Sequence, residues 1–105
     1  MISFEFYVNS YMGTAIPEKE FDVLAARATE ALARMERIYR VQGTPVEHAM
    51  AVCAMAETLW HRRNEELFSP KTKASTRYVF GRKSLSRELY EKATIYLDIY
   101  RGVKV

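Results

Sequence analysis

The stretch that decides the fold reads TPVEHAMAVCAMAETLWHRRNEE, residues 44–66. Its first four residues have the form of a capping box, in which the Thr44 hydroxyl accepts from the Glu47 amide and the Glu47 carboxylate accepts from the Thr44 amide. Pro45 stands at the first helical position, where no amide hydrogen is needed. We therefore expect a central helix over residues 45–66.

This helix is apolar around most of its circumference, because only Glu57 and Thr58 are strongly polar between residues 49 and 60. Such a helix should be buried on most sides. Polarity returns after Trp60, which indicates an end that emerges into water. Its small residues would let neighbouring helices, or another subunit, approach closely: Ala49, Ala51, Ala54 and Ala56.

Length and composition are those of an ordinary globular protein. With 105 residues, 49% hydrophobic and 28% charged, the sequence predicts one domain with its own core. No run approaches the roughly 20 apolar residues of a membrane helix, and the N-terminus lacks the pattern of a signal peptide. The lone Cys53 predicts no intrachain disulfide and is best explained as core filler in a reducing compartment, so we expect synthesis in the cytoplasm.

The first fifteen residues alternate aromatic and polar side chains without helical spacing. We expect an extended arm over residues 1–15 that ends in a turn at Gly13. Its aromatic side chains would lie on the helices and close the core.

A first long helix is expected over residues 17–41, starting at Pro17 with acidic residues in its first turns. It should stop before Gly43, so that a short connection makes the central helix antiparallel to it. Apolar residues recur at intervals of three and four: Phe21, Leu24, Ala28, Leu32 or Ala31, Met35, and Ile38 or Tyr39.

Residues 67–85 are the least helical part of the chain. Pro70 and Gly81 interrupt the pattern, and residues 76–80 alternate as in a strand, so we expect an exposed loop or a short hairpin near Tyr78–Phe80. The segment is strongly basic, because no acid lies between Glu66 and Glu88, whereas six positive charges do: Lys71, Lys73, Arg77, Arg82, Lys83 and Arg87.

A last helix is expected over residues 86–101, starting near Ser86, with Leu85 and Tyr90 forming a hydrophobic staple across the cap. Gly102 would end it, leaving residues 102–105 as a short tail. Its apolar face would comprise Leu89, Ala93, Tyr96 or Leu97, and Tyr100.

The predicted fold is therefore all-α: a small three-helix domain, or four with a short extra turn, with an N-terminal arm and a long basic loop or short hairpin between the last two helices.

The sequence shows no pattern typical of catalysis. His48, Cys53 and His61 stand at no metal-ligand spacing, and Cys53 has no base aligned beside it. No phosphate-binding glycine motif or nucleophile elbow occurs. We expect no enzyme activity, no metal and no cofactor.

The basic loop is the stronger functional signal. Its lysines and arginines beside Tyr78 and Phe80 could neutralise phosphates and stack bases. The same composition suits a loop that docks on an acidic protein or adds a strand to a neighbour's sheet edge. A merely solvated loop is the third interpretation.

Several features taken in order resemble a known family. An aromatic arm leads to Tyr11-Met12-Gly13-Thr14 and then to Ile16-Pro17-Glu18-Lys19-Glu20-Phe21. An alanine-rich helix follows over residues 49–60. The last helix ends in residues 93–97 (ATIYL) and 100–103 (YRGV). Together these features resemble the head–tail connector proteins (adaptor or head-completion proteins) of long-tailed bacteriophages and prophages, over nearly the whole chain.

The resemblance implies a structural protein of the virion neck. Such proteins form a ring, often of twelve copies, beneath the portal of a DNA-filled head, and carry the stopper or tail while continuing the DNA channel. In that case the C-terminal segment would face the portal: Tyr100, Arg101, Gly102, Val103, Lys104 and Val105. The loop would meet a neighbouring subunit or the stopper: Lys71, Lys73, Arg77, Tyr78, Val79, Phe80, Arg82 and Lys83.

The expected partners are thus copies of the chain itself, the portal protein, and the stopper or tail-completion protein, with transient non-specific contact with DNA and none with a membrane. Two alternatives remain open from the residues alone. One is a small basic helical module that binds nucleic acid through the loop. The other is a regulatory, antitoxin-like protein that buries an apolar face in one partner.

Overall fold

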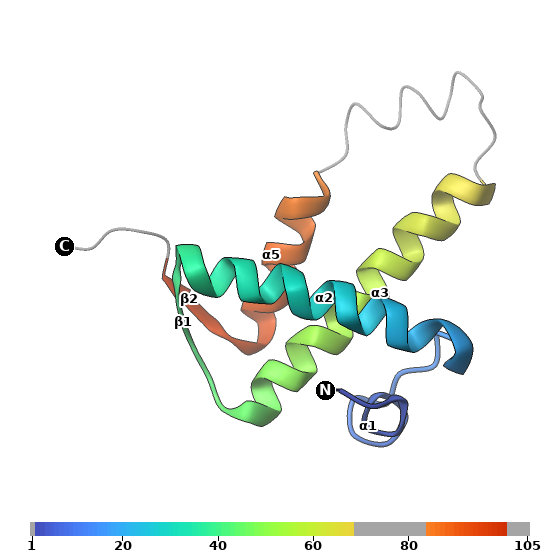
Figure 1. Ribbon diagram of the computed structural model, residues 1–105, viewed down its shortest axis with the longest axis horizontal. Coiled ribbons are helices and arrows are strands. Elements are labelled where there is room, and N and C mark those ends of the chain that lie inside the picture. Colours follow the sequence, from blue (N-terminus) through green and yellow to red (C-terminus); the bar gives the residue numbers. More distant parts are fainter. Residues whose placement is uncertain (1, 69–83, 101–105) are drawn as a thin grey trace.

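The computed structural model describes residues 2–68 and 84–100. Along the chain the elements are α1 (Phe4–Asn9), α2 (Glu18–Ile38), β1 (Arg40–Gln42), α3 (Pro45–Phe68), α5 (Leu85–Tyr96) and β2 (Asp98–Tyr100). Figure 1 shows their arrangement around α3. The described part is mostly helical, so the predicted all-α class is confirmed.

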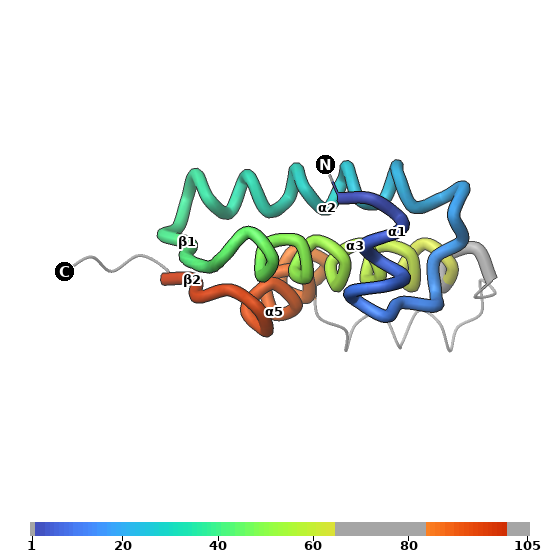
Figure 2. Tube along the Cα trace, turned by 90° about the horizontal axis from the view of Figure 1, so that it is seen from below, coloured from blue at the N-terminus to red at the C-terminus, as the bar shows by residue number. Residues whose placement is uncertain are grey.

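Two layers make up the domain. In Figure 2, α2 forms one layer, α3 and α5 form the other, and α1 lies across both at one end. Helix α3 packs against both α2 and α5. Two ion pairs tie these helices together near the polar end of α3, from Arg62 to Glu88 at 2.7 Å and from Arg63 to Glu20 at 3.1 Å.

The central helix forms as predicted and begins with the capping box. The Thr44 amide donates to Oε1 of Glu47 over 2.8 Å, and the Glu47 amide donates to Oγ1 of Thr44 over 3.1 Å. The small residues Ala51, Ala54 and Ala56 are buried by neighbouring elements of the same chain. Of the two interpretations of these alanines, the structure therefore supports close packing within the monomer.

Helix α2 is shorter than the predicted 17–41. Pro17 precedes it as the N-cap, and Tyr39 ends it in an extended conformation, with φ −119° and ψ 165°. Residues 40–42 form the strand β1 because they pair with residues 98–100. The predicted apolar stripe is buried at Phe21, Leu24, Ala28 and Leu32, whereas Ile38 is 58% exposed.

The N-terminal arm was predicted to be extended, but it contains the helix α1. Ser3 caps it by accepting a hydrogen bond from the Phe6 amide over 3.0 Å. The predicted turn is present, with Met12 at a positive φ of 66°. The expectation that the aromatics close the core is confirmed: Tyr7 is fully buried, and its ring lies 5.0 Å from that of Phe21 between centroids.

The last helix starts and ends earlier than the predicted 86–101. Its N-cap is Ser84, which accepts from the Arg87 amide over 3.1 Å, so Leu85 is already helical and the predicted staple from Leu85 to Tyr90 is wrong. The helix ends at Tyr96, and residues 98–100 form β2. Leu89, Ala93 and Leu97 are buried as expected.

Strands β1 and β2 pair antiparallel, with Arg40 opposite Tyr100 and Val41 opposite Ile99. This two-stranded ribbon joins the end of α2 to the end of α5 (Figure 1). It was not predicted. Its partly buried Val41 and Ile99 pack against the core.

The predicted loop over residues 67–85 is shortened at both ends, by α3 to Phe68 and by α5 from Leu85. Residues 69–83, with the hairpin expected near Tyr78–Phe80, lie outside the described residues.

Candidate functional site

Most residues predicted to form interfaces lie outside the described ranges. This applies to all the loop candidates, Lys71, Lys73, Arg77, Tyr78, Val79, Phe80, Arg82 and Lys83, and to residues 101–105. Tyr100 is described, but not on a helix face as expected. It lies in β2 opposite Arg40 and is 53% exposed.

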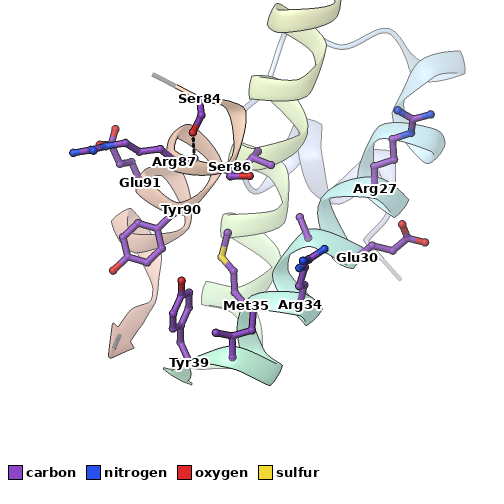
Figure 3. Close-up of a pocket in the computed structure, with 13 residues that line it drawn as sticks. Arg27, Glu30, Arg34, Met35, Tyr39, Ser84, Ser86, Arg87, Tyr90 and Glu91 are labelled. Carbon is purple, nitrogen blue, oxygen red and sulfur yellow. Dashed lines mark hydrogen bonds and ion pairs between the residues drawn. The ribbon is translucent and has the colours of Figure 1, made fainter. Parts of the chain in front are cut away.

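An open groove of about 900 Å³ lies between α2 and α5, as Figure 3 shows. We call it the α2–α5 groove. Successive turns of α2 supply one wall and the first half of α5 the other. Its lining residues are Arg27, Glu30, Ala31, Arg34, Met35, Ile38, Tyr39, Ser84, Ser86, Arg87, Leu89, Tyr90 and Glu91.

The lining of the α2–α5 groove is mixed, with polar and apolar side chains in similar shares. Leu89 is buried, and Met35 is partly buried against the core. At one end the rings of Tyr39 and Tyr90 meet edge to face, with centroids 6.1 Å apart and planes at 71°. Of the apolar residues that line the groove, Ile38 of α2 is exposed, whereas Leu89 of α5 is covered by the core.

Charged side chains flank this interior. Arg27, Glu30 and Arg34 come from α2, while Arg87 of α5 donates to Oε2 of Glu91 over 3.3 Å. In Figure 3, the Arg87 and Glu91 side chains point away from α2, on the outer side of α5. An apolar side chain with charged neighbours is the kind of ligand that this arrangement can hold.

A second polar cluster links the arm to the central helix. The Tyr7 hydroxyl donates to Oε2 of Glu57 over 2.7 Å and accepts from the amides of Ala15 and Ile16, each at 3.0 Å. The Tyr11 hydroxyl lies 3.4 Å from Oε1 of Glu57. The cluster thus links α1 and residues 15–16, which precede α2, to the Glu57 carboxylate of α3.

Burial and the neighbouring Glu57 carboxylate keep the two tyrosine hydroxyls of this cluster protonated. Burial, followed by the hydrogen bond to Glu57, raises the pKa of Tyr7 to about 12, and burial raises the pKa of Tyr11 further. Burial and then the charge of Glu57 raise the pKa of Cys53 to about 12. A protonated, fully buried thiol is a poor nucleophile, in agreement with the prediction that Cys53 fills the core.

The two histidines lie at the surface of α3. His48 is partly exposed, and its Nε2 lies 2.9 Å from Oε2 of Glu36, while His61 is exposed. Residues 2–68 and 84–100 contain no group of three or more side chains placed to hold a metal ion. No helix within those ranges is long and apolar enough to cross a membrane.

Sequence reasoning missed both the groove and the role of Glu57. The signal for Glu57 was present, because an acid inside an apolar helix must find donors, and the arm supplies two tyrosines. Arg27 and Arg34 fall outside the apolar stripe of α2, so no local pattern marks them as part of a site. That α5 would lie beside them depends on the packing of helices distant in sequence.

Comparisons of the sequence with known protein families and curated proteins, and of the fold with solved structures, found no match.

Proposed function

We propose that this chain is a subunit of a phage head–tail connector: a ring, expected to hold twelve copies, between the portal of a DNA-filled head and the stopper or tail. It would be made in the cytoplasm of the host bacterium and end in the virion neck. Its partners would be other copies, the portal protein and the stopper or tail-completion protein, with transient non-specific contact with the DNA in the channel.

The observation that supports this best is where the residues that carry the resemblance lie. Ile16 and Phe21 are in the core, and the backbone of Gly13 lies against the ring of Tyr7. The alanine-rich run occupies the centre of α3. Ala93 in the last helix and Leu97 at its C-cap are both buried in the core. The resemblance therefore concerns residues that determine the architecture.

Exposed apolar side chains also fit a subunit that works by assembly. Val8, Met12, Val23, Ile38, Val46, Leu85, Ile95 and Tyr100 are all exposed in the single chain. A ring requires each copy to present two different surfaces that meet on its neighbours. Weak contacts of this kind gain strength when many copies assemble on a preformed portal.

A complementation experiment tests the function. Inactivating the gene in a producing prophage should yield DNA-filled heads and free tails that do not join, as seen by electron microscopy, and the intact gene should restore joining. Deleting residues 71–83 should leave the helical circular-dichroism spectrum intact while abolishing joining. Normal virions without the gene product would refute the proposal.

The nucleic-acid alternative is tested on the same preparation. A connector subunit should bind duplex DNA weakly and without sequence preference. Tight, sequence-selective binding that weakens steeply with salt would instead favour the alternative.

A further inference from the structure

His48 places both nitrogens of its ring against hydrogen-bond acceptors. Its Nδ1 lies 3.0 Å from the carbonyl oxygen of Thr44, and its Nε2 lies 2.9 Å from Oε2 of Glu36. A carbonyl oxygen and an ionised carboxylate have no hydrogen to donate. Both contacts are therefore hydrogen bonds only when each ring nitrogen carries a hydrogen, which makes the ring a positively charged imidazolium.

A neutral ring can satisfy only one of these two acceptors. With its hydrogen on Nδ1, the lone pair of Nε2 faces the Glu36 carboxylate. With its hydrogen on Nε2, the lone pair of Nδ1 faces the Thr44 carbonyl. The complete arrangement thus depends on a proton that histidine side chains gain or lose between about pH 5 and pH 8.

These contacts join the end of one long helix to the start of the next. Glu36 lies in the last turn of α2, His48 lies in the first turn of α3, and the strand β1 runs between them (Figure 1). The Thr44 carbonyl that accepts from the ring also accepts the His48 backbone amide over 2.9 Å. The ring therefore ties α2 to the capping box of α3.

The surrounding charges leave Glu36 as the partner that favours the imidazolium. The dipole of α3 opposes a positive charge in its first turn. Among residues 2–68 and 84–100, the only ion pair of His48 is the one with Glu36. The charged groups next to this pair, along the chain and across the ribbon, are two of each sign: Arg37, Arg40, Glu47 and Asp98.

We propose that His48 and Glu36 form a latch between α2 and α3, which closes when His48 takes up a proton and opens when the proton is lost. The folded chain holds this proton by two hydrogen bonds that the unfolded chain lacks. The added stability is therefore present in acid and is lost as the pH rises. The latch follows from contacts within one chain and does not depend on the proposed ring function.

A double-mutant cycle measures the latch at two pH values. The unfolding equilibrium constants of the wild type, His48→Ala, Glu36→Ala and the double variant are determined by urea titration at about pH 5.5 and about pH 8. The matched control is the cycle of His61→Ala with Glu36→Ala. His61 is exposed on the same helix and has no hydrogen bond or ion pair within the described ranges.

We expect the His48–Glu36 coupling to change the unfolding constant by about two- to fivefold at the lower pH and by a factor near one at the higher pH. The effect is no larger because the two side chains are 30% and 42% exposed. The His61 cycle should give a factor near one at both pH values. In nuclear magnetic resonance spectra at the lower pH, the Nε2 hydrogen of His48 should give a signal that Glu36→Ala removes.

Three outcomes would overturn the latch. A coupling of equal size at both pH values would mean that the neutral ring makes the same contact. A coupling that is absent at both, or that grows with pH, would mean that the proton does not close it. An Nε2 hydrogen that exchanges with water as fast in the wild type as in Glu36→Ala would refute the contact itself.

Discussion

The hydroxyl of Tyr7 lies 2.7 Å from Oε2 of Glu57, and this hydrogen bond connects the N-terminal helix to the middle of the central helix. The Tyr7 hydroxyl oxygen also accepts hydrogen bonds from the amides of Ala15 and Ile16, so three segments of the chain meet at this one atom. A carboxylate inside an otherwise apolar stretch thus positions the arm rather than serving catalysis.

Replacing Tyr7 by Phe should lower the free energy of unfolding by about 2–3 kcal/mol, because the Ile16 amide and the Glu57 carboxylate lose a partner where water has little access. Urea titration followed by circular dichroism measures this loss. Tyr11→Phe is the matched control and should cost less than about 1 kcal/mol, since its hydroxyl lies 3.4 Å from Glu57. Equal losses would show that the bridging role of Tyr7 is unimportant.

Stability should fall in alkaline solution. The pKa of Tyr7 is raised from 10.0 to about 12, mainly by burial, so the folded chain holds the phenol proton more tightly than the unfolded chain. The resulting stabilisation is complete below pH 10 and is lost as the pH rises towards 12. Cys53, raised from 9.0 to about 12, acts in the same direction from pH 9 upwards.

Urea titrations across this range should therefore give a declining free energy of unfolding. The decline should be shallower in Tyr7→Phe and in Cys53→Ala, each of which removes one titrating group. A wild-type free energy that stays constant from pH 9 to pH 11 would contradict the assignment.

The thiol of Cys53 should react slowly with a maleimide or a disulfide reagent while the chain is folded. Full burial and a pKa near 12 leave little accessible thiolate at neutral pH. Labelling followed by mass spectrometry should be slower by about a hundredfold or more than in concentrated urea. Fast labelling without denaturant would mean that α3 is far more accessible than the structure shows.

A methyl group at Gly13 should destabilise the arm. A side-chain carbon built there would overlap ring atoms of Tyr7, which is buried and has no room to shift. We expect Gly13→Ala to cost about 1–3 kcal/mol. Gly43→Ala is the control: the atom in its way is one terminal methyl carbon of Leu97, which is also buried but can change rotamer, whereas the Tyr7 ring is held by its hydroxyl hydrogen bonds, so thermal unfolding should show a smaller loss.

Two serines near the start of α5 should differ sharply. Ser84 accepts the Arg87 amide, so Ser84→Ala should cost about 1 kcal/mol. Ser86→Ala should be nearly neutral, because Ser86 is exposed and already lies inside the helix. If Ser86→Ala instead lowered the free energy of unfolding more than Ser84→Ala, Ser86 would be the N-cap, as the sequence predicted.

The sequence alone was sufficient for the central helix and for the existence of its two long neighbours. The capping box from Thr44 to Glu47 depends on contacts three residues apart, and the burial of Phe21, Leu24 and Ala28 follows from helical spacing. Such signals are local, so they can be read before any packing is known.

Only the tertiary structure decided the remaining features. Residues 40–42 and 98–100 become strands because each supplies the other with hydrogen-bond partners from the far end of the chain. The arm becomes a helix once Ser3 caps it and Tyr7 finds Glu57, and the α2–α5 groove exists only because two distant helices diverge over α3. Long-range partners select among conformations that the local sequence allows about equally, which is why these features escaped prediction from the sequence.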